Sequence, residues 1–183
     1  MRTKGLLMQK HSTVGTNLKK LEDRGCTIVH EVDAHTMSQH PLLSNKLFDR
    51  IVSNFPHAGF IHREHDTLQI RHHQKVVKGF LRNARCMLAA NGEAHVTHKT
   101  AYPFSEGEIK KIAKEVGLRL VKEVCFNKWD YPGYDNKRGD GDRSNETFPV
   151  GECSTFKFAN PSYAMVSHAL LSISFEGSSL RSL

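Results

Sequence analysis

The stretch Phe48-Asp-Arg-Ile-Val-Ser-Asn54-Phe-Pro56-His57-Ala-Gly59-Phe60 decides how this chain can fold. Its first half is apolar and β-branched, which favours a buried strand, and its second half is a polar loop. Pro56 fixes its own backbone φ and Gly59 permits a turn, so the loop is stiff. In open α/β sheets, ligands bind beyond the carboxyl ends of the strands. The pattern therefore places Asn54 and His57 at a candidate site, although an ordinary polar strand-to-helix connection has the same local pattern.

The composition limits the classes of protein to which the chain can belong. The chain has 183 residues, 38% of them hydrophobic, which is enough for one domain with a core. Its formal net charge of +7 favours a polyanionic partner such as RNA. The four cysteines are far apart, with no Cys-x-x-Cys pair, so a reduced intracellular compartment fits best. No apolar run approaches the roughly 20 residues that span a bilayer, so we expect a soluble monomer without a membrane partner.

The order of predicted elements indicates the fold class. Helical spacing predicts helices over Leu7–Leu21, Asp66–Ala90 and Ser105–Val116, and β-branched runs predict strands over Cys26–Val32, Phe48–Ser53, Glu93–Thr97, Leu118–Phe126 and Cys153–Phe158. This order predicts an α/β sandwich with a mostly parallel sheet. The last two strands are joined by a loop, which predicts an antiparallel pair. A seven-stranded sheet of this kind needs two further strands, for which the only place is before Met1.

Three local signals set the expected boundaries of these elements. Asn91-Gly92 is expected to close the second helix, and Ser105-Glu-Gly-Glu108 fits a capping box at the start of the third. Gly117 is expected to end that third helix. We expect residues 1–159 to form the domain and residues 160–183 to form a tail.

Residues 129–150 are rich in Gly, Asp, Asn and Pro and have no apolar periodicity, which predicts a long loop. Aromatic rings can stack on unpaired bases, and Lys or Arg side chains can contact phosphates. The loop carries both kinds, so we predict an RNA-binding surface made of Tyr131, Tyr134, Lys137, Arg138 and Arg143. A solvated loop that is basic by chance is the alternative.

Several runs of the sequence together resemble one known family. They are Val32–Met37, Phe48–Val52, Asn54–Phe60, His95–Thr100, Asp130–Gly141 and Phe148–Phe158. In this order they resemble the eukaryotic 25S ribosomal RNA uridine-N(3)-methyltransferase-like family. The resemblance implies a class I, Rossmann-like fold that uses S-adenosylmethionine, and methylation of N3 of a uridine in large-subunit rRNA. Such a substrate implies the nucleolus or nucleus, with the cytoplasm as the alternative.

The chain departs from that family at its start. Family members begin with a strand leading into a Gly-Glu-Gly-Asp-Phe-Ser type of loop, which holds the methionine end of the cofactor, and a second strand that ends in an acidic residue. This chain has neither, so we expect a domain that is incomplete at its N-terminus. The resemblance implies that Asp33, Ala34 and Asn54 bind the cofactor, with the Asp33 carboxylate on the adenine amino group.

The expected chemistry gives roles to the loop after the central strand. Methylation at N3 requires loss of a weakly acidic imide proton and alignment of the nitrogen with the methyl group. The Asn54 amide can donate to and accept from an imide edge at the same time. His57 is the expected base, because imidazole titrates near neutrality, and Pro56 stiffens the loop. The Asn-Phe-Pro-His run resembles a variant of the Asn-Pro-Pro-aromatic loop of methyltransferases that act on planar nitrogens.

Two alternatives to a methyltransferase remain. One is a catalytically inactive relative that acts at most as an RNA-binding module. The other is a metal-binding protein, which rests on His62-x-x-His65, His72-His73 and His95-x-x-His98. No spaced cysteine or carboxylate completes a familiar four-ligand set, so we predict no metal.

Overall fold

The protein is described by a computed structural model that places residues 5, 8–9, 12–59, 61–139 and 142–161. Its described part contains one sheet of four strands: β1 (Phe48–Asn54), β2 (Leu88–Lys99), β3 (Arg119–Cys125) and β4 (Cys153–Ala159). The order across the sheet is β1-β2-β4-β3. Alternation of strands with helices along the chain makes this a mixed α/β fold, as predicted.

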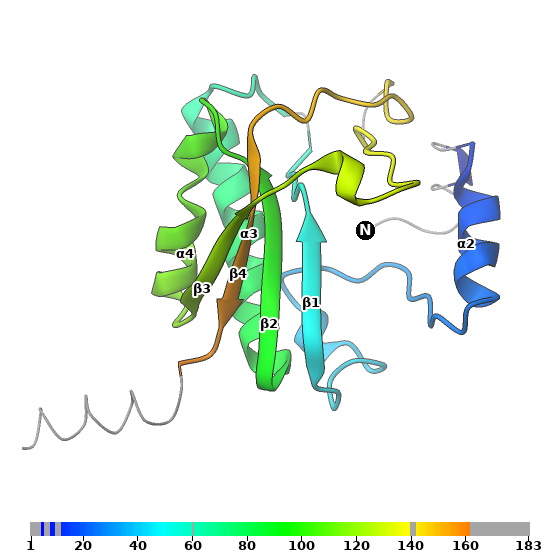
Figure 1. Ribbon diagram of the computed structural model, residues 1–183, viewed down its shortest axis with the longest axis horizontal. Helices are drawn as coiled ribbons and strands as arrows, with labels where there is room; N and C mark the ends of the chain where they lie inside the picture. Colours follow the sequence, from blue (N-terminus) through cyan, green and yellow to red (C-terminus); the bar gives the residue numbers. More distant parts are fainter. Residues whose placement is uncertain (1–4, 6–7, 10–11, 60, 140–141, 162–183) are drawn as a thin grey trace, which may run out of the picture.

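The strand directions combine parallel and antiparallel pairs. β1 pairs parallel to β2, with Ile51 opposite Ala94 and Asn54 opposite Thr97. β4 runs antiparallel to both β2 and β3, so three of the four strands point the same way. The antiparallel β3–β4 pair confirms the prediction for the last two strands. The carboxyl ends of β1 and β2 therefore meet at the same edge of the sheet (Figure 1).

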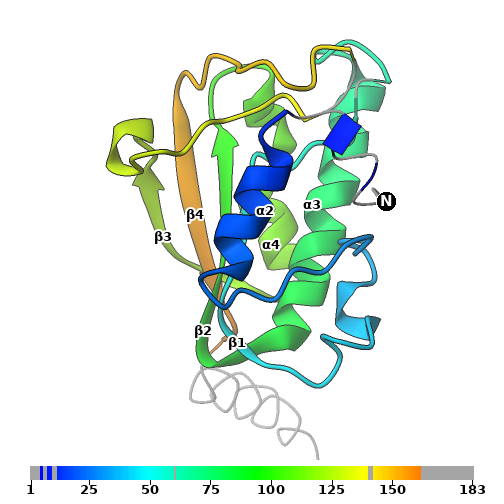
Figure 2. The same ribbon diagram turned by 90° about the vertical axis from the view of Figure 1, so that its right-hand side faces the viewer.

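Helices α3 (Thr67–Met87) and α4 (Ile109–Glu115) cover one face of the sheet. Figure 2 shows them as a layer beside the strands, with α2 (Val14–Glu22) on the side of β1. Helix α2 carries the predicted apolar spacing, but it has no buried residue. Three short 3-10 helices, Met37–Gln39, Phe104–Gly107 and Lys128–Asp130, lie in the connections. No helix of the described part is long and apolar enough to cross a bilayer.

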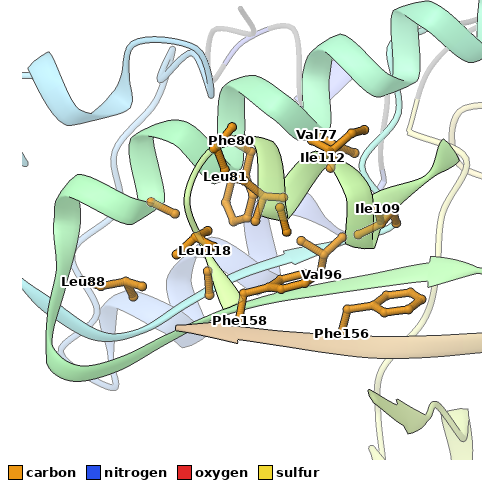
Figure 3. Packing of buried hydrophobic residues seen from close by; sticks show 14 of the residues in the cluster. Val77, Phe80, Leu81, Leu88, Val96, Ile109, Ile112, Leu118, Phe156 and Phe158 are labelled. Carbon is orange, nitrogen blue, oxygen red and sulfur yellow. The ribbon is translucent and has the colours of Figure 1, made fainter. Parts of the chain in front are cut away.

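The hydrophobic core lies between the sheet and these two helices (Figure 3). Leu81 of α3 and Phe158 of β4 are fully buried, and Val96 of β2 and Ile112 of α4 pack in the same cluster. Burial of each such side chain contributes about 1.5–3 kcal/mol relative to exposure. This cluster fixes α3 against β2, and α3 in turn supports the loop after β1.

The predicted strand over Cys26–Val32 is wrong. These residues form no strand, and Glu31 has a left-handed φ of 61°. A strand needs a neighbouring strand to satisfy its backbone groups. Among the described residues, β1 pairs only with β2, so this segment has no partner in the sheet. Its β-branched residues therefore do not produce a strand.

The burial of β1 and the end of α3 also differ from the prediction. β1 was expected to be buried, but Val52 and Asn54 are exposed and only alternate residues face the core. α3 ends at Met87, so Asn91-Gly92 lies inside β2. A Cβ at Gly92 would lie 2.6 Å from the Phe48 carbonyl oxygen, so the glycine permits close approach of β1.

The start of α4 differs from the predicted capping box, whereas its end agrees. Ser105 lies in the 3-10 helix before α4, and the N-cap is Glu108, with a φ of 47° and no capping hydrogen bond from its side chain. Glu108 instead pairs with Lys111. At the other end, Gly117 has a φ of 82°, and Leu118 N–H donates to the Ala113 carbonyl, which confirms the glycine stop.

Candidate functional site

A cavity of about 170 Å³ lies beyond the carboxyl ends of β1 and β2, where the sequence predicted a site. Three segments line it: the loop after β1, the end of β2 with the following 3-10 helix, and the 126–150 segment. The lining residues are Asn54, Phe55, Pro56, His57, Glu64, His98, Lys99, Phe104, Tyr134, Asn136, Lys137, Arg138 and Phe148. Six of the predicted catalytic and RNA-binding residues thus meet around one space.

The loop after β1 is held in a fixed conformation. Phe55 N–H donates to the Thr97 carbonyl, which extends the β1–β2 ladder by one residue. Phe55 itself has a left-handed φ of 51°, and its ring packs edge-on against Phe126 and Phe148. The left-handed backbone turns the chain sharply, and Asn54 and Pro56 both line the cavity. Asn54 also lines a groove with Val52 and Tyr131. The Asn54 amide makes no hydrogen bond to the described residues and is available to a ligand.

His57 and His73 of α3 converge on one carboxylate, that of Glu64. His57 Nε2 lies 3.1 Å from Glu64 Oε1, and His73 Nε2 lies 3.4 Å from Oε2. On the opposite side of each ring, a backbone N–H donates to Nδ1: Gly59 to His57 at 3.0 Å, and Ala58 to His73 at 3.1 Å. Because Nδ1 of His57 is an acceptor, the His57 ring proton lies on Nε2 and faces Glu64. His73 Nε2 lies closer to the Gln69 amide nitrogen, at 3.1 Å, than to Glu64.

These contacts strongly favour the ionised form of Glu64. The hydrogen bond from His57 and the neighbouring His73 ring hold the pKa of the Glu64 carboxyl well below its usual range, against the effect of burial. Glu64 Oε2 itself is buried without a hydrogen-bond partner among the described residues. The buried Gln69 anchors the same loop: its amide donates to the Gly59 carbonyl and accepts from His62 N–H. The loop is therefore tied to α3 by a charged cluster and a buried amide.

The same three side chains have the composition of a two-histidine, one-carboxylate metal site. The ligand atoms of His57, Glu64 and His73 lie within 4.8 Å of one another. A metal-bound histidine usually donates its other ring N–H to an oxygen. At His57, Nδ1 accepts a backbone N–H group, which places the proton on the nitrogen that would have to bind the metal. The hydrogen bonding of His57 therefore fits a histidine–carboxylate pair better than a metal ligand.

The 126–150 segment forms the opposite wall of the cavity. Asn136 is buried and donates to the Phe148 carbonyl at 2.6 Å, which ties the middle of the segment to its C-terminal part. Lys137 pairs with Asp135 at 2.8 Å. Arg138 is half-buried, and its Nε is fully buried without a hydrogen bond to any described residue. Burial raises the pKa of the Tyr134 hydroxyl, so it remains a neutral donor.

Sequence reasoning missed the residues at the end of β2. Lys99 points its Nζ toward the Phe104 and Phe148 rings, 4.9 and 5.1 Å from their centroids. His98 is buried beside it, and its Nδ1 bonds to the Lys99 carbonyl. The available signal was the run His95–Thr100, which contributed to the family resemblance without any role being given to Lys99. Glu64 was missed because only tertiary contacts bring it to both histidines.

Four predicted residues lie outside this cavity. Asp33 and Ala34 precede the first 3-10 helix, and Asp33 Oδ1 accepts from His35 N–H and contacts His35 Nδ1. Tyr131 stacks on Phe126 and lines a shallow groove with Val52 on the other sheet face. Arg143 is exposed and paired with Glu146. Phe60, a candidate for stacking on a base, lies outside the described residues.

Comparison with protein families identifies the chain. Residues 2–138 match the model of the BMT5-like family, described as rRNA (uridine-N3-)-methyltransferase BTM5-like. The match spans well over half of the 183 residues. The chain belongs to the BMT5-like family. The family membership predicted from the sequence motifs is thereby confirmed, and strands β1, β2 and β3 lie within the matched residues.

Two relatives of this BMT5-like chain come from Arabidopsis thaliana. Heavy metal-associated isoprenylated plant protein 41 is 48% identical over 84% of the chain, and the match covers 30% of that protein. An uncharacterized protein is 51% identical, with 81% of the chain and 73% of the relative covered. The BMT5-like chain therefore spans less than a third of the first relative and about three quarters of the second.

Solved methyltransferase structures are more distant from the BMT5-like chain. An S-adenosylmethionine-dependent methyltransferase from Clostridium acetobutylicum has a TM-score of 0.46 and 10% identity, with 82% of this chain and 72% of that chain covered. The M1.HpyAVI–SAM complex has a TM-score of 0.40 and 12% identity, with coverage of 74% and 55%.

Proposed function

We propose that this chain methylates N3 of a uridine in large-subunit rRNA with S-adenosylmethionine, and that the cavity at the Asn54 loop receives the target base. Membership of the BMT5-like family supports the reaction class. The observation that carries the choice of site is that Asn54 lines a cavity at the strand ends and that its amide has no partner among the described residues. An amide that can donate and accept simultaneously matches the imide edge of uracil.

The cavity suits a planar base removed from its stack. N3 lies on the Watson–Crick edge, so the enzyme must act on an unpaired base or extrude it. Phe104, Phe148 and Tyr134 supply ring surfaces on which a base can rest. Most of the rate acceleration comes from the alignment of N3, for which a rigid loop is needed. The charged cluster and Gln69 provide that rigidity.

S-adenosylmethionine supplies an electrophilic methyl group when bound. The residues that we predicted to hold its adenine end have hydrogen-bonding atoms available for it. Asp33 uses Oδ1 for His35, which leaves Oδ2 for an adenine amino group, and Ala34 packs against the core beside it. These contacts fit the adenine end, with Asn54 at the methyl end. Neither Asp33 nor Ala34 lines the cavity at the Asn54 loop.

The geometry of His57 favours a positioning role over that of a general base. A base needs an unprotonated nitrogen directed at the substrate. His57 Nδ1 accepts the Gly59 N–H, and Nε2 faces Glu64. In this arrangement His57 fixes the Pro56–Gly59 turn, while Asn54 contacts the base.

Residues on the wall formed by the 126–150 segment can also contact RNA. Lys137 and Arg138 line the base site and can hold phosphates next to the target nucleotide. Tyr131 and the strongly exposed Trp129 lie farther along the segment, where they can stack on flanking bases. Arg143 is engaged by Glu146 and is expected to contribute less. An rRNA substrate would place the protein in the nucleolus, with the cytoplasm as the alternative.

A second candidate is RNA binding without methyl transfer. The observation in its favour is that the cavity joins aromatic rings and cations, whereas Asp33 and Ala34 of the cofactor side lie outside it. The two functions share the base pocket and differ only in use of the cofactor.

The test is transfer of labelled methyl from S-adenosylmethionine to single-stranded RNA by the 183-residue chain. Nucleoside mass spectrometry should find N3-methyluridine, and RNA with N3-methyluridine in place of uridine should accept nothing. Methyl on another base would contradict the uridine assignment. RNA binding with no titratable S-adenosylmethionine binding would favour the second candidate.

A further inference from the structure

The cavity holds a cation to which the sequence patterns gave no role. Lys99 is the last residue of β2, and its half-buried ammonium lies over the rings of Phe104 and Phe148. In the part of the chain that the structure describes, no carboxylate pairs with it and no side-chain hydrogen bond to its Nζ is found. A partly buried cation that no carboxylate contacts directly can gain from an anionic ligand group, so this arrangement points to a site for such a group.

A second cation lies on the opposite wall. Arg138 lines the same cavity, and its buried Nε lacks a hydrogen-bond acceptor among the described residues. A buried donor without an acceptor loses free energy that a ligand oxygen would restore. Burial lowers the pKa of Lys99, the nearby Glu64 opposes this shift, and the positive charge of Arg138 adds to it. The two cations and the Glu64 carboxylate therefore act on the same small volume.

The proposed methylation of uracil creates an anion inside this cavity. When the N3–H bond of uracil breaks, the proton passes to water and the electron pair remains on the ring. The charge then spreads from N3 over the two carbonyl oxygens that flank it. Fixed positive groups at developing charge are among the strongest contributions to catalysis, because a dry site screens them little.

We propose that Lys99 is a catalytic residue that contacts a uracil carbonyl oxygen and stabilises the ionised imide, with the positive charge of Arg138 on the opposite wall adding to this stabilisation. This inference rests on the proposed uridine function of the cavity. It accounts for loss of the imide proton without a dedicated base, because a uracil whose anion is stabilised can lose its N3 proton directly to water. Asn54 then holds the remaining imide edge.

Any pH dependence of this site must include its titratable and charged neighbours. Those lining the cavity with Lys99 are His57, Glu64, His98, Tyr134, Lys137 and Arg138. The Cys153 thiol also acts electrostatically on Lys99, and burial raises the pKa of that thiol. The test therefore follows ionisation of the ligand directly and not the pH dependence of activity.

The probe is a short single-stranded RNA with one 5-fluorouridine, whose fluorine NMR shift reports ionisation of N3. The pKa of the bound probe imide should fall by about one unit or more below that of the free probe, which corresponds to about tenfold tighter binding of the anion. Lys99→Met should abolish this fall, and Lys99→Arg should retain part of it. Methyl transfer by Lys99→Met should lose about 10²-fold in kcat with KM little changed.

Lys110→Met is the matched control. Lys110 also lies over a phenylalanine ring, that of Phe156, but it pairs with Glu123 and lies outside this cavity. Its probe shift should equal that of the unmodified chain, and thermal unfolding should show that both variants are folded.

The outcomes separate this inference from the function on which it rests. A bound probe with an unchanged imide pKa, or an equal fall in Lys99→Met, would overturn the role of Lys99 and leave the uridine site intact. Displacement of the probe by inorganic phosphate from the unmodified chain, but not from Lys99→Met, would show that Lys99 holds a backbone phosphate, which also overturns its role. Failure of every uridine-containing RNA to bind would remove the proposed function itself.

Discussion

His57 Nε2 lies 3.1 Å from Glu64 Oε1, across the turn that follows β1. The same carboxylate faces His73 of α3, so one charge joins the loop to the helix that covers the sheet. Backbone N–H groups of Ala58 and Gly59 set the orientation of both rings. The position of Asn54 at the cavity thus depends on contacts that begin three residues after it.

Replacement of Glu64 by Gln should destabilise the chain by about 1 kcal/mol at neutral pH. Hydrogen bonds to a charged group are worth about 1.5–3 kcal/mol, and partial exposure of Glu64 reduces this value. Because the pKa of Glu64 is lowered on folding, its contribution is present above its ordinary value of 4.5 and is lost as the pH falls below it. Urea unfolding from pH 7 to pH 3 should show the two proteins converging.

Glu115→Gln is the control for this effect. Glu115 pairs with Lys78 on the exposed surface, where an ion pair contributes about 0–1 kcal/mol. If Glu64→Gln lowers the free energy of unfolding by no more than Glu115→Gln does, a structural role for the cluster is contradicted.

Replacement of His57 by Gln separates positioning from proton abstraction. A Gln amide can donate to Glu64 as Nε2 does, but it cannot serve as a base. If His57 fixes the loop, His57→Gln should keep most of the methyl-transfer kcat, and His57→Ala should lose about tenfold or more. Equal losses of about 10²-fold or more in both variants would identify His57 as the base.

Arg138→Ala should weaken RNA binding more than Arg143→Ala. Arg138 has a buried donor without an acceptor in the described part of the chain, whereas Arg143 is already paired with Glu146. Removal of one phosphate-binding cation reduces the slope of log K against log salt by about 0.7 for single-stranded RNA. Fluorescence anisotropy at several salt concentrations measures both quantities. Equal slopes for the two variants would contradict this division.

Gly79→Ala should destabilise the protein although Gly79 lies in the middle of α3. A Cβ at Gly79 would overlap the His35 imidazole, which contacts Asp33. Overpacking of this kind costs about 1–3 kcal/mol. Gly15→Ala in the exposed α2 is the control, because its Cβ would meet only ordinary contact, and Ala favours a helix over Gly by about 1 kcal/mol. Urea unfolding should show opposite signs for the two changes, and equal effects would contradict the tight contact at His35.

The sequence predicted most elements whose signals are local. Apolar spacing located α3 and α4, and the glycine stop at Gly117 was correct because a left-handed residue there depends on the helix alone. The strand over Cys26–Val32 failed because strand formation depends on a partner that local residues do not reveal. The capping box at Ser105 failed because the chain enters α4 through a 3-10 turn.

The residues of the candidate site also fall into those that the sequence could name and those that it could not. Asn54, Pro56 and His57 could be named from the sequence, because a strand followed by a stiff polar loop is a local pattern. The pairing of His57 with Glu64 and His73 was not predictable, since it depends on how the loop meets α3. Lys99 was passed over because a lysine at a strand end is ordinary until rings and a second cation are found around it.

By itself, the sequence determined the fold class, the family and the loop that carries the site, because periodicity and ordered motifs are properties of neighbouring residues. The tertiary structure alone decided which side chains share the cavity, and which hydrogen bonds and charged neighbours each of them has there. Packing of α3 against β2 brings Glu64 to two histidines, and the 126–150 segment brings Arg138 opposite Lys99. Hydrogen bonding and charge act over a few ångströms in space, so their consequences appear only when the chain is folded.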